Sequence, residues 1–264
     1  MLKVAFDTIY KHQLNVGHRF PMEKYELLPK QLLRKNICNK DNFFSPPQIK
    51  KELLLSTHDE DYYNNLINLS LSKIDTRQIG FPLSYKLIKR EHVIAQGTIQ
   101  NTHYAQKYGI SMNIAGGTHH AFRNRPGAFC MLNDQAIAAN YLIDNNLAKR
   151  VMIIDLDVHQ GDGTASIFEH QNSVFTISFH GKKNYPFRKQ NSDFDLPLDD
   201  NTDDKAYLRA LKNHLPRLVD LFNPDFIFYL AGVDVLKSDK LGRLGLSIAG
   251  CKARDQFVLN FCKQ

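Results

Sequence analysis

The sequence predicts an α/β fold in a single domain, 1–264, with a mostly parallel central sheet covered by helices on both faces. Short, continuously apolar runs such as Val151–Ile154 and Phe226–Leu230 are typical of strands buried on both faces. Longer stretches with helical periodicity separate these runs, as the crossovers of a parallel sheet require. No internal repeat or low-complexity linker divides the chain, so we expect one domain.

Local patterns place the elements one by one. The first half predicts a strand at Leu2–Phe6, a helix at Met22–Lys35 interrupted near Pro29, a helix at Asp59–Leu71, a long helix at Ser84–Tyr108 before Gly109, a buried strand at Met112–Ala115, and a helix at Asn133–Asn145 that Asn133 or Asp134 caps. The second half predicts strands at Val151–Ile154, Val174–Ser178 and Phe226–Leu230, and helices at Gly163–His170, Asp203–Phe222 and Ile248–Cys262. Ligands of such sheets bind beyond the carboxyl ends of the strands.

Composition narrows the compartment and the partners. The formal net charge is +7, but the basic residues are dispersed, so we expect a solvated surface and no nucleic-acid partner. The N-terminus has no signal-peptide pattern and no run approaches the ~18 apolar residues of a membrane span, so no membrane partner is expected. The four cysteines have no paired spacing and indicate reduced thiols in a cytoplasmic protein: Cys38, Cys130, Cys251 and Cys262.

An acidic and histidine-containing segment follows the predicted strand Val151–Ile154. Asp155, Asp157 and His159 alternate, and alternate residues of an extended chain point the same way. Asp162 follows shortly after, so three carboxylates and an imidazole gather at a buried strand exit. Such a cluster is costly without a cation, and carboxylates with imidazole are natural ligands of Zn²⁺. The segment therefore predicts a metal site rather than a simple helix cap.

Two further strand exits carry polar groups. Gly116 and Gly117 permit a tight turn before the histidine pair His119 and His120, which can supply the general acid and base of metal-assisted hydrolysis. After Phe226–Leu230, a second carboxylate ligand could come from Asp234 or from Asp239. Spacing alone does not choose between these two aspartates.

Together these segments resemble the histone deacetylase and acetylpolyamine amidohydrolase family, which has an arginase/deacetylase-like fold. The resemblance rests on Gly116–Ala121, Gly127–Asp134 and Asp155–Gly163 in this order and covers nearly the whole chain. The stretch Gly17–Pro29, and Gln160 where many relatives carry a second histidine, are similar to the class IV-like bacterial branch.

The resemblance implies a role for each matching position. One zinc ion per chain would bind Asp157, His159 and Asp239, the context Ser-Asp-Lys-Leu-Gly selecting Asp239 over Asp234. A metal-activated water would attack the amide, with His120 as general base and later proton donor. Asp162 would support His120, and Asp155 would support His119.

The resemblance also implies a substrate tunnel and a second cation. Phe129 would line a narrow tunnel for the acyl-lysine stem, with Tyr185 or Phe187 as the opposite wall. A structural K⁺ would bind at five positions: Asp155, Asp157, His159, Ser178 and Phe179. The expected substrate is an acylated lysine in a protein or peptide, or a small acylated amine.

One departure from the family pattern concerns the end of the sequence. The transition-state tyrosine of the family follows a strand and a Gly-rich turn that come after the last helix, and this sequence stops at Gln264. We therefore expect the catalytic domain, 1–264, to lack its C-terminal strand and tyrosine loop.

Three other functions stay open beside the deacylase. An acetylpolyamine-type amidohydrolase would prefer small acylated amines to peptides. A catalytically silent acyl-lysine binder would account for the missing tyrosine. An arginase-like dimanganese enzyme shares the fold but wants a second dense carboxylate cluster near Asp234, which Val235-Leu236-Lys237 does not supply.

Overall fold

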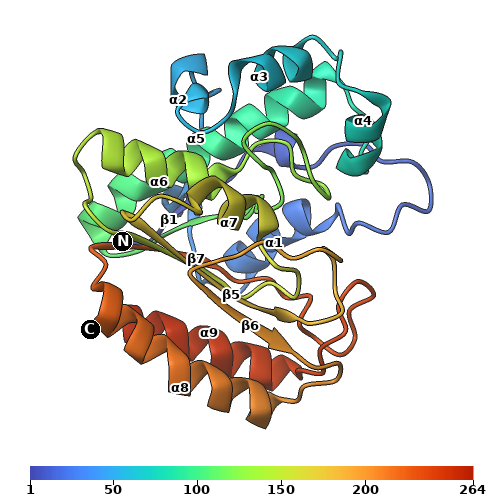
Figure 1. Ribbon diagram of the computed structural model, residues 1–264. Coiled ribbons are helices and arrows are strands. Elements are labelled where there is room, and N and C mark those ends of the chain that lie inside the picture. Colours follow the sequence, from blue (N-terminus) through green and yellow to red (C-terminus); the bar gives the residue numbers. More distant parts are fainter. Residues whose placement is uncertain (264) are drawn as a thin grey trace. The chain divides into compact units, whose positions relative to one another are not determined.

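Two parallel β-sheets organise the chain, which the computed structural model describes over residues 1–263 (Figure 1). The chain divides into two units, Met1–Leu142 and Ile143–Gln264, and each unit holds one sheet. Every pairing between named strands of the described residues is parallel, and helices flank the sheets, which confirms the predicted α/β class. The expected single sheet is instead two separate sheets, since no pairing among the described residues joins a strand of one sheet to a strand of the other.

The first unit is built on a three-stranded sheet in the order β2-β1-β3. Its strands are β1 (Lys3–Ala5), β2 (Phe43–Phe44) and β3 (Ser111–Asn113). The long helix α5 (Tyr85–Tyr108) packs on β1 and β3; Ser84 Oγ caps its start and Gly109, at φ +83°, ends it in the left-handed region. The remaining helices are η1 (Thr8–Tyr10), α1 (Lys24–Arg34), η2 (Lys40–Asn42), α2 (Lys51–Leu55), α3 (Glu60–Ile67), α4 (Lys73–Ile79) and α6 (Asp134–Asp144).

Three details of the first unit differ from the sequence expectation. Helix α1 continues through Pro29 instead of breaking there. Helix α3 ends at Ile67, before the predicted Leu71, because the chain turns with Leu69 at φ +55°. The strand near residue 112 is not buried on both faces, since the side chain of Met112 is 48% exposed.

The second unit contains a four-stranded sheet in the order β6-β5-β4-β7. The strands are β4 (Val151–Asp155), β5 (Val174–Gly181), β6 (Phe194–Leu198) and β7 (Phe226–Leu230). Helices α8 (Asp204–Phe222) and α9 (Ile248–Cys262) lie side by side on one side of this sheet, and α7 (Asp162–Phe168) lies on the other (Figure 1). The side chains of Asp203 and Ser247 cap α8 and α9.

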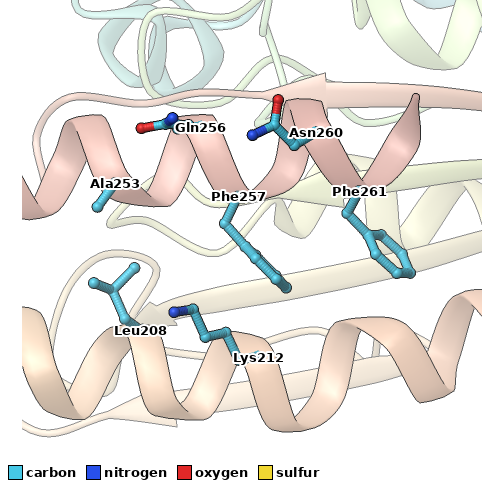
Figure 2. A pocket seen from close by; sticks show the side chains of 7 residues that line it. All are labelled: Leu208, Lys212, Ala253, Gln256, Phe257, Asn260 and Phe261. Atoms are coloured by element: carbon cyan, nitrogen blue, oxygen red, sulfur yellow. The ribbon is translucent and has the colours of Figure 1, made fainter. Parts of the chain in front are cut away.

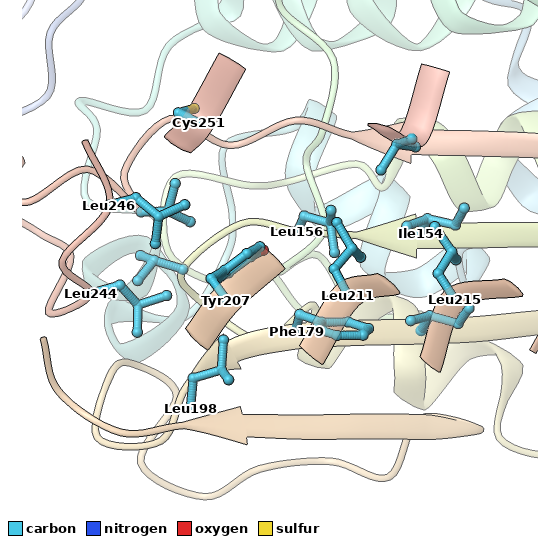
Figure 3. Packing of buried hydrophobic residues seen from close by; sticks show 14 of the residues in the cluster. Ile154, Leu156, Phe179, Leu198, Tyr207, Leu211, Leu215, Leu244, Leu246 and Cys251 are labelled. Carbon is cyan, nitrogen blue, oxygen red and sulfur yellow. The ribbon is translucent and has the colours of Figure 1, made fainter. Parts of the chain in front are cut away.

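The core of the second unit lies between its sheet and the pair α8–α9. Ile154 and Phe179 of the sheet meet Leu211 and Leu215 of α8, all of them buried (Figure 3). Burying each such side chain stabilises the fold by about 1.5–3 kcal/mol. This packing fixes the sheet against α8 and α9, so the residues that follow the carboxyl ends of β4 and β7 start from defined positions.

A groove of about 540 Å³ lies between α8 and α9 (Figure 2). Its lining is mostly apolar and amide side chains: Leu208, Lys212, Ala253, Gln256, Phe257, Asn260 and Phe261. Lys212 is the one titratable group among them, and its Nζ lies 5.8 Å from the ring centroid of Phe257. The groove thus offers no pair of groups for acid–base or metal chemistry. Within residues 1–263, no helix combines the length and apolarity needed to span a bilayer.

Candidate metal centre

The exits of β4 and β7 lie next to each other. The last paired residues are Asp155 and Leu230, and the ladder extends by one bond from Leu156 N to Leu230 O at 3.1 Å. The chain then leaves both strands on the same edge of the sheet, because parallel strands end together. Asp157 and His159 follow β4, and Asp234 follows β7.

Asp157, His159 and Asp234 form a group whose potential ligand atoms all lie within 4.8 Å of one another. His159 Nδ1 lies 3.0 Å from Asp157 Oδ1 and 3.1 Å from Asp234 Oδ2. The three side chains are 16–19% exposed, so an ion can reach them while most of their surface is shielded. Two carboxylates and one imidazole are a donor set that suits Zn²⁺ and leaves coordination positions open.

Backbone hydrogen bonds orient the two carboxylates of this group. Asp157 Oδ1 accepts from His159 N at 2.8 Å, and Asp234 Oδ1 accepts from Val158 N at 3.1 Å. The second bond ties the β7 exit to the β4 exit. Gly232 permits this close approach, because a Cβ at that position would stand 2.4 Å from Asp157 Oδ2.

The electrostatics of the group indicate a place for a cation. Burial acts to lower the pKa of His159, but hydrogen bonds and charges from Asp157 and Asp234 outweigh it and raise this pKa to about 10. Burial and the nearby Asp157 carboxylate raise the pKa of Asp234 to about 6, against the lowering effect of His159. In the absence of a metal ion, the two carboxylates therefore favour a protonated His159 between them. A bound metal ion would supply the positive charge in place of that proton.

The structure brings Asp234 to Asp157 and His159, and it does not bring Asp239 there. Asp239 Oδ1 accepts from Leu241 N at 2.7 Å and from Gly242 N at 3.1 Å, so this carboxylate stabilises a turn. Asp239 was the third ligand expected from resemblance, and the geometry favours Asp234 in its place. The local Ser-Asp-Lys-Leu-Gly context is explained by the turn.

The neighbouring acidic residues have hydrogen-bonding roles of their own. Asp155 Oδ1 accepts from Asp157 N at 3.0 Å, and Asp155 is the register partner of Ser178 on β5. Ser178 Oγ lies 3.0 Å from His180 Nδ1 in the buried part of β5. Phe179, the neighbour of Ser178, is fully buried. Asp162 is the first residue of α7, and its Oδ1 accepts from Gly163 N at 3.0 Å.

The histidine pair belongs to the first unit. His119 and His120 are both buried, and their ring centroids lie 4.0 Å apart. Gly127 packs directly against the His120 backbone, since a Cβ there would stand 2.2 Å from His120 O. The segment Gly127–Asp134 thus supports the histidine turn by close backbone contact.

Asp134 holds the turn that carries the histidines, a role the sequence did not reveal. Its Oδ1 accepts from Gly117 N at 2.9 Å and from Thr118 N at 2.8 Å, and its Oδ2 accepts from Thr98 Oγ1 at 2.6 Å. The helix cap is Asn133, whose Oδ1 accepts from Ala136 N at 3.0 Å. The sequence signal for this role is an acidic residue, Asp134, directly after the cap of a helix that is mostly apolar and buried.

His58 is a second support that sequence reasoning missed. Its Nε2 accepts from Asn133 N at 3.0 Å, which leaves Nδ1 to donate to Phe122 O at 2.9 Å. Burial lowers the pKa of His58 to about 4, so the imidazole is neutral and one tautomer serves both bonds.

The three predicted tunnel residues occupy different surroundings. Phe129 is half-buried at φ +62°, its ring packs on Phe20 and Phe81, and its N donates to Ile79 O at 2.9 Å. In the second unit, Phe187 is 90% exposed, and Tyr185 is half-buried before Pro186.

Gln160 fixes the segment that carries Tyr185 and Phe187. Its Nε2 donates to Gln190 O and to Asp195 Oδ1, both at 2.7 Å, and its Oε1 accepts from Gln190 N at 2.9 Å. These three bonds use both donors and the acceptor of the buried amide. A histidine ring has only two nitrogens, so a histidine at this position could make at most two of the three bonds.

Comparison with known proteins decides the family. The model of the histone deacetylase domain matches residues 18–264. The chain belongs to the histone deacetylase family. An uncharacterized protein of Picosynechococcus sp. is 41% identical over 259 residues, covering 98% of this chain and 86% of that protein. Histone deacetylase 2 of Arabidopsis thaliana is 28% identical over 256 residues, covering 94% of this chain but 66% of that protein.

Solved structures of the family share the fold. The crystal structure of an HDAC homolog complexed with SAHA has a TM-score of 0.88 and 26% sequence identity, and the match covers 100% of this chain and 77% of that one. The expected arginase/deacetylase-like fold is therefore confirmed, and the chain has the fold of a family of deacetylases.

Proposed function

We propose that the chain is a zinc-dependent deacylase that hydrolyses the amide of acetyl-lysine or a related acylated amine. The observation that carries this proposal is the group Asp157, His159 and Asp234 at two adjacent strand exits. Membership of the histone deacetylase family supports the reaction class. The raised pKa of Asp234 supports a bound cation, since burial destabilises its uncompensated charge.

These three residues are the zinc ligands that we propose. Zinc, when bound, polarises an amide carbonyl and lowers the pKa of a coordinated water toward about 7. Asp157 and Asp234 supply anionic oxygens, and His159 supplies a neutral nitrogen after it loses the proton it holds between them. The bond from Val158 N keeps the Asp234 carboxylate turned toward the site.

His120 is the general base and later proton donor in this proposal, with His119 beside it. Asp155 and Asp162 are proposed as the carboxylates that set the tautomers of the two histidines. Support for the pair comes from its burial and from the four bonds to Asp134, which fix the turn before it. Phe129, Tyr185 and Phe187 remain proposals for the substrate walls. We likewise propose K⁺ at Asp155, Asp157, His159, Ser178 and Phe179, and a cytoplasmic location, which the free cysteines support.

Metal analysis of paired variants tests the ligand set. Asp234→Ala and Asp157→Ala should lose most of the bound zinc, because each removes one of three protein ligands. Asp239→Ala is the matched control and should keep its zinc, since Asp239 binds turn amides instead. Loss of zinc from Asp239→Ala together with full occupancy in Asp234→Ala would return the assignment to Asp239.

The role of His120 needs a rate measurement on a form with detectable turnover. His120→Ala should keep its zinc and lose roughly 10²–10⁴ in rate on an acetyl-lysine peptide, as expected for a positioned acid–base group. An unchanged rate would show that the histidine pair is structural. The same assay on acetylated polyamines separates the two substrate classes: faster turnover of the small amines would favour an acetylpolyamine-type enzyme. Tight peptide binding without turnover would favour a silent binder.

A further inference from the structure

Arg254, in the middle of α9, is among the largest fully buried side chains of the protein, with 0% exposure. Burying a guanidinium is costly unless charged or polar partners replace its water. Its partners therefore indicate why the charge is there. The proposed mechanism gives this residue no task.

The guanidinium joins two segments that are far apart in the sequence. Arg254 Nη1 donates to Leu156 O at 3.0 Å and to Gly232 O at 2.7 Å. Its Nε donates to Asp255 Oδ1 at 2.8 Å, and the same oxygen accepts from Tyr229 Oη at 2.6 Å. One face of the arginine is thus fixed by a carboxylate, and the other bridges two backbone carbonyls.

Those two carbonyls mark the place where the sheet ends. The ladder between β4 and β7 closes with the bond from Leu156 N to Leu230 O, so Leu156 O and Gly232 O lie beyond it. Carbonyls that are shielded from water require another donor, and Arg254 Nη1 provides it for both. The arginine therefore continues the connection between the two strands past their last backbone bond.

The bridged segments are the ones that carry the metal group. Leu156 stands directly before Asp157, and Gly232 stands two residues before Asp234. Gly232 also packs against Asp157, because a Cβ atom added at Gly232 would lie 2.4 Å from Asp157 Oδ2. A change in the spacing of Leu156 O and Gly232 O therefore changes the spacing of the two carboxylates.

We propose that Arg254 is a positioning residue for the metal centre, which holds the exits of β4 and β7 at the separation that brings Asp157 and Asp234 to one ion. This proposal rests on the proposed zinc ligands. It goes beyond them because it assigns metal affinity to a residue on α9 that contacts no ligand side chain in the bonds described.

Zinc affinity and a spectrum test the proposal without relying on activity. We would measure zinc binding by competition with a chromogenic chelator, and the visible absorption of the Co²⁺-substituted protein. Arg254→Met should bind zinc about 10–100-fold more weakly, the usual effect of losing a group that orients metal ligands. Its Co²⁺ bands should shift, because the ligand geometry changes. Arg254→Lys keeps a charge and donors and should fall between wild type and Arg254→Met.

Arg90→Lys is the matched control for Arg254→Lys. Arg90 is also a large buried arginine, 2% exposed, but it binds Tyr10 O and Glu91 instead of the strand exits. Arg90→Lys should leave zinc affinity and the Co²⁺ spectrum unchanged, even if it lowers the free energy of unfolding as much as Arg254→Lys does. If Arg254→Met does not fold, the comparison of the two lysine variants decides.

Failure of this proposal is distinguishable from failure of the proposed function. Wild-type protein that binds no zinc would overturn both. Wild-type protein that binds zinc through Asp234, with Arg254→Lys and Arg254→Met matching its affinity and Co²⁺ spectrum, would overturn the positioning role alone. An equal loss of affinity in Arg90→Lys would also overturn it, because the effect would then follow general stability.

Discussion

At the residue scale, local spacing predicted two of the proposed ligands and could not predict the third. Asp157 and His159 alternate after one strand, so their convergence is a property of the local chain. Asp234 reaches them only because β7 pairs with β4 in a register that aligns Leu230 with Asp155. That register depends on the tertiary fold and cannot be read from local sequence. The local sequence around Asp239 resembled a ligand motif, but the Asp239 carboxylate accepts from two turn amides.

The residues that hold the histidine turn were hidden for the same reason. Asp134 stood in the sequence as one of two candidate helix caps, and Asn133 proved to be the cap. The carboxylate of Asp134 instead binds groups from α5 and from the turn at Gly117, which are separated from it by 16 or more positions. Contacts between residues so far apart in the sequence can be recognised only in the folded structure.

His58 makes the stability depend on pH. Its pKa is about 4 in the folded protein and 6.5 in the unfolded chain, so the unfolded chain binds the extra proton as pH falls below 6.5. The stabilisation is complete above pH 6.5 and is lost toward pH 4. This one residue should lower the free energy of unfolding by about 2 kcal/mol between pH 7 and pH 5.

Urea unfolding of wild type and His58→Gln at the two pH values measures this contribution. Glutamine keeps a donor and an acceptor but does not titrate in this range. The loss of stability from pH 7 to pH 5 should therefore be about 2 kcal/mol smaller in the variant, while other groups affect both proteins alike. Equal losses in the two proteins would mean that His58 is already protonated in the folded state.

At the scale of elements, long helical patterns and continuous apolar runs were predictable, and strands without an apolar run were not. The bounds of β7 and α9 agree with the sequence expectation at both ends, and α5 and α8 differ by one residue at their starts. Strand β6 was missed because its sequence, FDLPL, is no continuous apolar run, and its short alternation includes Asp195 and Pro197, residue types that strands disfavour. It pairs with β5 alone, and an edge position tolerates Pro197.

The segment between β5 and β6 should depend on Gln160 for its order. Gln160→Leu removes the bonds to Gln190 and Asp195 at nearly constant volume. The Gln190 amide, which donates to Gln160 Oε1, should then exchange with solvent roughly 10-fold faster, since a lost hydrogen bond costs about 1–1.5 kcal/mol. Hydrogen exchange resolved to residue 190 measures this effect. Gln171→Leu is the control, and equal exchange in wild type and Gln160→Leu would contradict the prediction.

At the scale of the whole molecule, the proposed metal ligands are confined to one unit. Asp157, His159 and Asp234 all belong to Ile143–Gln264, whereas His119, His120 and Asp134 belong to Met1–Leu142. The two separate sheets were not predictable, because apolar runs in a sequence indicate strands without showing which strands pair. The proposed ligands and the histidine pair therefore come from different halves of the sequence.

A metal ion bound at the proposed centre should stabilise the folded chain. An ion that binds only the folded form stabilises it by about 2.7 kcal/mol when its free concentration is 100 times Kd. For a chain of 264 residues, this corresponds to a rise of roughly 5–10 °C in the unfolding midpoint. Because the ligands lie in residues 143–264, probes in that unit should report the shift. Calorimetry with and without zinc measures the rise in the midpoint. Spectroscopic signals of tyrosine and histidine residues assigned to each unit report where in the chain the stabilisation occurs.

Two variants separate zinc binding at the proposed centre from binding elsewhere. Asp234→Ala should show no rise in midpoint at the same zinc concentration, because the three-ligand group is broken. His120→Ala should keep the full rise, since this histidine belongs to the other unit and is no ligand in the proposal. Chelator should return wild type to its metal-free midpoint. A rise of equal size in Asp234→Ala would place the stabilising ion at a different site and remove the metal centre from this edge of the sheet.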